Sequence, residues 1–135
     1  MREIVVYDSS VLIDQIRTNC HLERMQRVAG IIRNSSVVLA ELWRAASSQV
    51  DRKVIEEIKG RYSVLTPTAA NWLESGQILA RMRTDRGYER KKLRDLRFDV
   101  LIALTARAHG ARVITSNRAE FELIRKYRDF KLECW

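Results

Sequence analysis

The hydrophobic pattern of this chain alternates short apolar runs with longer segments of helical periodicity. Residues 4–7 (IVVY) are β-forming and predict a buried parallel strand. Helical spacing of apolar residues follows from Val11 to Ile16, so Asp8 stands where a strand stops and a helix begins. Further strands are expected at residues 36–39, 63–65, 112–115 and 130–132. Further helices are expected at residues 22–33, 40–48, 51–61, 69–82, 93–109 and 120–127.

This alternation of strands and helices predicts one domain, residues 1–135, with a three-layer α/β/α fold. Its central, mostly parallel sheet of four to five strands would be flanked by helices. A chain of 135 residues buries enough surface to fold without a disulfide or a structural metal. Gly110 is expected to end the longest helix as its C′ residue.

Polar residues collect where the predicted strands end. Asp8 follows the first strand, Glu41 comes shortly after the second, and Ser116 and Asn117 follow residues 112–115. In parallel α/β sheets, ligands bind outside the carboxyl ends of the strands. We therefore expect the functional site at this edge of the sheet.

Each candidate carboxylate also has an ordinary structural explanation. Asp8 could cap the helix that follows it, and Glu41 could interact with a helix dipole from a first turn. Asp99 lies in the apolar segment 98–104, where a salt bridge to Arg97 could hold it. Together, however, the three acids favour a hard divalent cation, because Mg²⁺ and Mn²⁺ prefer carboxylate oxygens. Such cations activate water and stabilise charge on a phosphoryl group.

The charge distribution favours a polyanionic partner. The chain has 25 Lys and Arg against 17 Asp and Glu, which gives a net charge of +8. Residues 81–97 contain eight of the basic residues and three acids, so this segment alone carries +5. It could hold the phosphate backbone of RNA or bind an acidic segment of a protein partner. The substrate-binding residues predicted in it are Arg86, Arg90, Lys91 and Lys92.

Several other protein classes are disfavoured. The apolar runs are far shorter than the ~20 residues of a membrane span, and the N-terminus lacks a signal-peptide pattern, so we expect a cytoplasmic protein. Cys20 and Cys134 have no metal-binding spacing, and the two histidines are isolated, which argues against a zinc site. Trp43 and Trp72 are expected in the core.

Three segments together match the motifs of a known family. Residues 4–14 (IVVYDSSVLID) join an apolar strand, an Asp, a Ser pair and an apolar helix. Residues 40–42 (AEL) supply a Glu, and residues 98–103 (FDVLIA) are followed by residues 110–117 (GARVITSN). In order and spacing, over essentially the whole chain, these segments resemble the PIN-domain ribonucleases. The resemblance is greatest to the VapC-type toxins of prokaryotic toxin–antitoxin pairs.

The resemblance implies a PIN-like fold and roles for individual residues. It makes Asp8, Glu41 and Asp99 the catalytic and metal-binding acids, with Glu41 acting directly or through water. It implies that Asn117 is a further catalytic residue, which supports the attacking water, and that Glu120 is a weaker acidic metal ligand. Two hydroxyl residues would complete the substrate site, Ser9 and Ser116.

The implied function is that of a Mg²⁺-dependent endoribonuclease, with Mn²⁺ as a possible substitute, acting as a toxin. A metal-activated water would hydrolyse RNA and leave 5′-phosphate and 3′-hydroxyl ends. The implied partners are RNA, an antitoxin protein and a second copy of the chain. Two alternatives remain open, an RNA-processing PIN nuclease without a toxin role and a nonenzymatic nucleic-acid-binding module. A phosphoacceptor receiver domain is disfavoured, because no Asp follows the strand predicted at residues 63–65.

Overall fold

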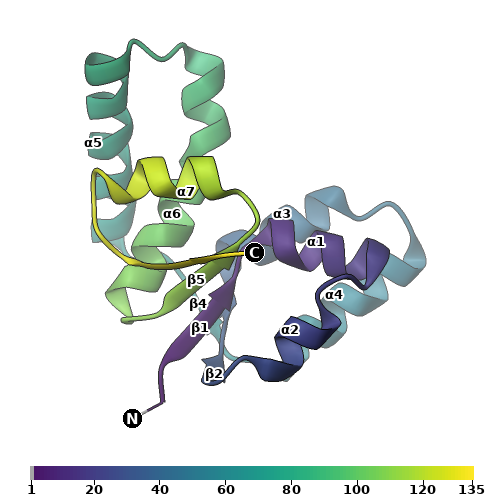
Figure 1. Ribbon diagram of the computed structural model, residues 1–135. Coiled ribbons are helices and arrows are strands. Elements are labelled where there is room, and N and C mark those ends of the chain that lie inside the picture. Colours follow the sequence, from purple (N-terminus) through teal and green to yellow (C-terminus); the bar gives the residue numbers. More distant parts are fainter. Residues whose placement is uncertain (1) are drawn as a thin grey trace.

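Four short parallel strands form the central sheet of the computed structural model, which describes residues 2–135 (Figure 1). Their order is β2 (Ile31–Ile32), β1 (Ile4–Tyr7), β5 (Arg112–Thr115) and β6 (Lys131–Cys134). β3 (Asn34–Ser35) and β4 (Val64–Leu65) form a separate two-stranded parallel sheet. The helices are α1 (Ser9–Thr18), α2 (Leu22–Arg27), α3 (Ser36–Ala45), α4 (Gln49–Arg61), α5 (Ala69–Arg86), α6 (Arg90–Ala108) and α7 (Arg118–Arg125).

The two faces of the sheet pack into two hydrophobic clusters, which confirms the three-layer α/β/α prediction. Val6 and Val113 point into the larger cluster, to which α3, α5, α6 and α7 contribute. Val5, Tyr7 and Ile114 point to the opposite face, where α1 and α2 lie. This division follows from the two-residue period of a strand, since successive side chains point to opposite faces.

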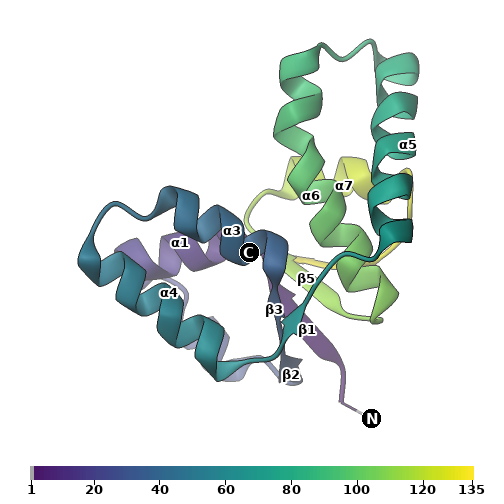
Figure 2. The ribbon, with the colours of Figure 1, turned by 180° about the vertical axis from the view of Figure 1, so that it is seen from behind.

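Helix α6 joins the sheet to a projecting helical hairpin. Every residue from 99 to 106 is buried, whereas most of the first half of the helix is exposed. Figure 2 shows α5 and the first half of α6 side by side beyond the sheet. Gly87, in the left-handed region at φ 65°, ends α5 and allows the chain to reverse into α6. Gly110 has φ 63° just after α6, as predicted.

The prediction of one helix over residues 22–33 is wrong in its second half. Helix α2 ends at Arg27, and Ile31–Ile32 form strand β2 beside β1. Gly30 has φ 132°, which no helix allows, and the Ile31 N–H donates to the Glu3 carbonyl at 2.8 Å. The edge position next to β1 therefore overrides the helical spacing of the apolar residues.

The strand predicted at residues 36–39 is also wrong, because these residues begin helix α3. Ser35 caps the helix, and its side chain accepts a hydrogen bond from the Val38 N–H at 3.4 Å. Glu41 consequently lies in the middle of α3 rather than in a first turn. A cap and burial of the Val37–Leu39 run outweigh its β propensity.

The remaining elements agree with the predictions to within a few residues, and the last strand, β6, lies at an edge of the sheet. The expectation that Trp43 and Trp72 are core residues is wrong. Their exposed fractions are 38% and 56%. Across residues 2–135, no helix is both long enough and apolar enough to cross a membrane.

We predict that Gly30→Ala destabilises the fold by about 1–3 kcal/mol. A Cβ at this position would lie 2.5 Å from the Glu3 carbonyl oxygen, and the backbone φ of 132° disfavours any L residue. Gly60→Ala is the matched control, because a Cβ there meets nothing within 4 Å and Gly60 lies in α4. Urea unfolding should show a lower midpoint for Gly30→Ala and an equal or higher one for Gly60→Ala. Equal destabilisation of both would contradict this account.

Candidate metal centre

Three carboxylates from three different elements meet at the carboxyl end of the central strands. Asp8 follows β1, Glu41 lies in α3, and Asp99 lies in the buried half of α6. Each offers a carboxylate oxygen, and these oxygens all lie within 4.8 Å of one another. Residues far apart in the sequence thus form one acidic cluster.

Asp8 is the most deeply placed of the three, with no exposed surface. Its N–H donates to the Ile114 carbonyl at 2.9 Å, which fixes the backbone beside β5. Its Oδ2 accepts hydrogen bonds from Ser10 Oγ at 2.7 Å and Thr115 Oγ1 at 2.8 Å. Its Oδ1 is buried and has no partner in the described part of the chain. The side chain makes no capping bond to α1, so helix capping does not explain this Asp.

Glu41 is half-buried and faces Asp8. Ser9 Oγ, in the first turn of α1, donates a hydrogen bond to Glu41 Oε1 at 3.1 Å. Burial raises the pKa of Glu41, the charge of Asp8 raises it further, and the Ser9 hydrogen bond lowers it. Interaction with a helix N-terminus does not explain Glu41, because it lies in the middle of α3.

Asp99 is the most strongly perturbed of the three. Burial raises its pKa to about 8, with further contributions from the charges of Asp8, Glu41 and Glu120, and Lys92 lowers it. A salt bridge to Arg97, the structural alternative to a metal site, is not among the ion pairs of residues 2–135. The Arg97 guanidinium instead lies over the Phe98 ring. The charge of Asp99 therefore has no close cationic partner within the described chain.

This donor set fits a hard divalent cation. All three side chains offer oxygens, and a cation between them would relieve both their mutual repulsion and their burial. The unpartnered Oδ1 of Asp8 is the observation that indicates a cation, because a buried carboxylate oxygen without a partner destabilises the folded state. Asp8, Glu41 and Asp99 are thus the residues that could hold a metal ion.

The other predicted residues at this edge lie around the cluster. The Asn117 N–H donates to Thr115 Oγ1 at 2.9 Å, and the Ser116 N–H donates to Ser10 Oγ at 3.1 Å. Glu120, in the first turn of α7, acts on the pKa of Asp99 but does not belong to the 4.8 Å cluster. The backbone after β5 therefore supports the hydroxyl groups that hold Asp8.

Sequence reasoning missed the roles of two residues, Ser10 and Thr115. Both donate to the same oxygen of Asp8, and their hydroxyl oxygens lie 3.3 Å apart. The only signal was a hydroxyl residue in the helix start after β1 and another at the end of β5. The pairing itself depends on the register that places Tyr7 opposite Ile114.

The predicted substrate-binding residues of the basic segment do not act as one group. Lys92 acts electrostatically on Asp99, seven residues further along α6. Arg86 instead lies at the end of α5, where its Nε donates to the Tyr127 hydroxyl at 3.3 Å. Arg90 and Lys91 are exposed in the first turn of α6. Only Lys92 of this set is electrostatically linked to the acidic cluster.

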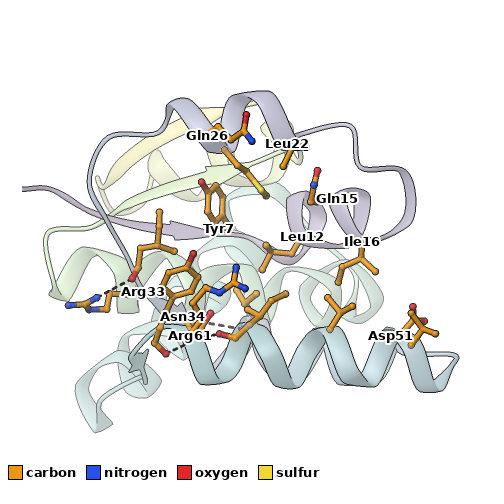
Figure 3. Close-up of a pocket in the computed structure, with 18 residues that line it drawn as sticks. Tyr7, Leu12, Gln15, Ile16, Leu22, Gln26, Arg33, Asn34, Asp51 and Arg61 are labelled. Atoms are coloured by element: carbon orange, nitrogen blue, oxygen red, sulfur yellow. Dashed lines mark hydrogen bonds between the residues drawn. The ribbon is translucent and has the colours of Figure 1, made fainter.

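A separate groove with a volume of about 550 Å³ lies between α4 and the pair α1 and α2 (Figure 3). Leu12 and Ile16 point into it from α1, and Leu22 borders it from α2. Val50 borders it from α4 and is 71% exposed, and Arg61 lines it as well. The three clustered carboxylates are not among its lining residues. This groove is mainly apolar, which suits a protein segment better than a phosphate.

Comparison with known families identifies one match. The sequence model of the PIN domain matches residues 5–127, which include all three clustered acids. A search of curated protein sequences gave no match.

Solved structures with the same fold come from toxin–antitoxin complexes. A chain of the VapBC2 complex from Rickettsia felis, bound to a DNA fragment from its promoter, has a TM-score of 0.71 and 22% identity, and 98% of each chain is covered. A chain of FitAB bound to a DNA fragment has a TM-score of 0.68 and 15% identity, with 96% of this chain and 94% of that chain covered. A chain of VapBC-5 from Mycobacterium tuberculosis has a TM-score of 0.63 and 20% identity, and 98% of each chain is covered. At these identities the likeness shows the fold.

We predict that the metal-free protein loses stability as the pH rises from about 4 to about 8. Asp99 binds its proton more tightly in the folded state, with a pKa of about 8 against 3.8 in its unperturbed state. The folded state therefore holds the extra proton across this window and loses that advantage on deprotonation. Thermal unfolding in EDTA should show Tm falling with pH for the wild type. Asp99→Asn should flatten this fall and raise Tm at pH 8 by several degrees.

The control is Asp95→Asn, an exposed Asp one turn earlier in α6. It should keep the pH dependence of the wild type. Mg²⁺ or Mn²⁺ at pH 8 should raise the Tm of the wild type and of the control but not of Asp99→Asn. Parallel pH profiles for all three proteins would rule out this interpretation of the cluster.

Proposed function

Because this chain belongs to the PIN domain family, we propose that it is a Mg²⁺-dependent endoribonuclease, with Mn²⁺ as a possible substitute, and the toxin of a toxin–antitoxin pair. The observation that carries the proposal is the cluster of Asp8, Glu41 and Asp99, whose oxygens lie within 4.8 Å of one another. No cation of the described chain forms an ion pair with them. Such a centre suits hydrolysis of a phosphodiester.

Asp8 and Asp99 would hold the metal ion, Glu41 would hold it directly or through the attacking water, and Glu120 would be an outer acidic residue. When bound, the ion would supply a water of lowered pKa and positive charge beside the scissile phosphate. Ser10 and Thr115 position Asp8 by binding its Oδ2, which leaves Oδ1 for the ion.

Glu41 is placed to take part in proton transfer. Ser9 fixes its Oε1, so Oε2 remains to accept the proton of the attacking water. A carboxylate within hydrogen-bond reach of the attacking water can act as its general base. Asn117 would orient that water from the end of β5. RNA hydrolysis would then leave a 5′-phosphate and a 3′-hydroxyl.

Lys92 would hold an RNA phosphate near the centre, since its charge already acts on Asp99. Ser116 would also contact the substrate from the end of β5, where its N–H donates to Ser10 Oγ beside Asp8. Arg90 and Lys91, exposed on the same helix, would extend this contact along the RNA backbone. Arg86 would add to the positive field from the end of α5.

Two alternatives keep the fold but change the role. An RNA-processing PIN nuclease would use the same centre without an antitoxin. A nonenzymatic nucleic-acid-binding module would need no metal, and the intact set of three acids argues against it. The toxin role is supported by the likeness of the fold to chains of VapBC and FitAB complexes.

An antitoxin segment would bind in the groove between α4 and the α1–α2 pair. The groove is mainly apolar, and Arg33, Arg61 and Asp51 are the charged residues among those that line it (Figure 3). This combination suits an amphipathic helix that carries acidic residues next to its apolar face. The resemblance to VapC-type toxins also implies a homodimer, which light scattering would test.

We predict that the purified protein cuts single-stranded RNA with Mg²⁺ or Mn²⁺ and not with EDTA. Asp8→Asn and Asp99→Asn should each lower the cleavage rate by about 100-fold or more, because each removes an oxygen charge from the metal centre. Gel analysis of labelled total RNA, with end-group mapping of the products, measures both claims.

Asp95→Asn is the matched control, since it removes one exposed carboxylate from the same helix. It should cut at nearly the wild-type rate. Cleavage by Asp99→Asn at the wild-type rate would refute the site. Cleavage that persists in EDTA would refute the metal dependence.

For the antitoxin groove, we predict that Val50→Glu and Leu22→Glu weaken binding of the proposed antitoxin partner by about tenfold or more. A carboxylate in an apolar docking surface must lose its hydration when the partner binds. Leu73→Glu is the control, because Leu73 is 73% exposed, close to the 71% of Val50, and lies on α5 outside the groove. Calorimetry should show near-wild-type affinity for the control, and equal affinities for all variants would exclude this groove.

A further inference from the structure

The guanidinium groups of two arginines lie over the ring of Phe98, where α3 packs against α6. The Arg97 Cζ lies 4.7 Å from the centroid of the Phe98 ring, and the Arg44 Cζ lies 5.6 Å from it. Arg97 and Phe98 belong to α6, whereas Arg44 comes from α3. The two guanidinium groups are thus brought together by the tertiary fold rather than by local sequence.

One of the two arginines lies close to the acidic cluster. Arg44 lies three residues after Glu41 on the same face of α3, and its guanidinium lies over the ring of Phe98, the residue before Asp99 in α6. Burial raises the pKa of Glu41, and the positive charge of Arg44 acts in the opposite direction. Arg44 is therefore close enough to act on the centre without contacting it.

Neither arginine is used in an ion pair. Arg44 and Arg97 are both exposed, and none of the salt bridges within residues 2–135 includes them. Arg44 lies three residues after Glu41 on α3 and could form a salt bridge with that acid if its side chain turned toward the cluster. Stacking on Phe98 instead keeps both guanidinium groups at the rim, with their N–H donors available.

We propose that Arg44 and Arg97, held by Phe98, are positioning residues that bind the phosphates of single-stranded RNA next to the scissile bond. The inference rests on the proposed ribonuclease function. It specifies that the site recognises the phosphates and the exposed bases of single-stranded RNA. Guanidinium groups donate to phosphate oxygens and stack on the exposed bases of single-stranded RNA. A duplex hides its bases and offers no such stacking.

The test measures the salt dependence of RNA binding in the full chain with Asp99→Asn as a non-cleaving background. The probe is a fluorescein-labelled single-stranded RNA of mixed sequence, about 12 nucleotides long, with Mg²⁺ present. Each lost phosphate contact should reduce the slope of log Kd against log salt by about 0.7. Arg44→Gln and Arg97→Gln should each show this reduction, and the double variant should show about twice it.

Arg52→Gln is the control, because it removes the same charge from an exposed position on α4. Its slope should equal that of the background. Phe98→Leu should weaken binding by about two- to fivefold, the size of an exposed cation–π contact, while Phe98→Tyr keeps the ring and the affinity. Circular dichroism and Tm show that each variant is folded before its binding is interpreted.

The outcomes separate this inference from the proposed function. If the Arg44, Arg97 and Arg52 variants share one slope while the wild type cuts RNA, the inference is wrong and the ribonuclease stands. If the background binds no RNA while the wild type cuts it, the inference is also wrong. Absence of both binding and cleavage overturns the two together. A double variant with an unchanged salt slope but a changed molar mass by light scattering would assign this surface to contact between copies of the chain.

Discussion

The repulsion among three clustered carboxylates is the constraint on which this structure depends. Asp8, Glu41 and Asp99 bring their oxygens within 4.8 Å of one another in a region that is largely shielded from water. Burial raises the pKa of Glu41 and of Asp99, and the charges of the neighbouring acids raise both further, so the ionised carboxylates disfavour the folded state. The surrounding fold must therefore hold the acids in place against their own repulsion.

The central sheet and α6 provide this support. β1 lies between β2 and β5, so the backbone that ends in Asp8 is hydrogen-bonded on both sides. Residues 99–106 of α6 are all buried, which fixes the helix that presents Asp99. A one-residue shift of β1 against β5 would exchange the two hydrophobic faces and separate Asp8 from Thr115. The packing of the core and the geometry of the centre are thus one requirement.

Sequence patterns located Asp8 and Asp99 because their positions follow from local rules, the end of an apolar strand and a long helical repeat. Glu41 was placed near the centre, but its position in the middle of α3 was not predicted, since residues 37–39 have the composition of a strand. Residues 37–39 form a helix rather than a strand because Ser35 caps α3 and because they are buried against other helices. A local sequence pattern does not contain this information. For the same reason the hydrogen bond between Arg86 and Tyr127, which lie far apart in the sequence, was not predicted.

The protein carries a net charge of +8, yet none of the ion pairs of residues 2–135 includes an acid of the cluster. Lys92 acts on Asp99 without pairing with it, and Arg44 and Arg97 stack on Phe98 instead. A salt bridge to any of these cations would stabilise the metal-free fold, but it would also compete with an external cation for the same oxygens. Because these cations lie around the cluster and form no salt bridge with it, the metal-free fold is less stable than it could be. Their positive charge can still attract a polyanion. An unsatisfied centre in a basic chain is therefore better explained by selection for binding than by selection for stability.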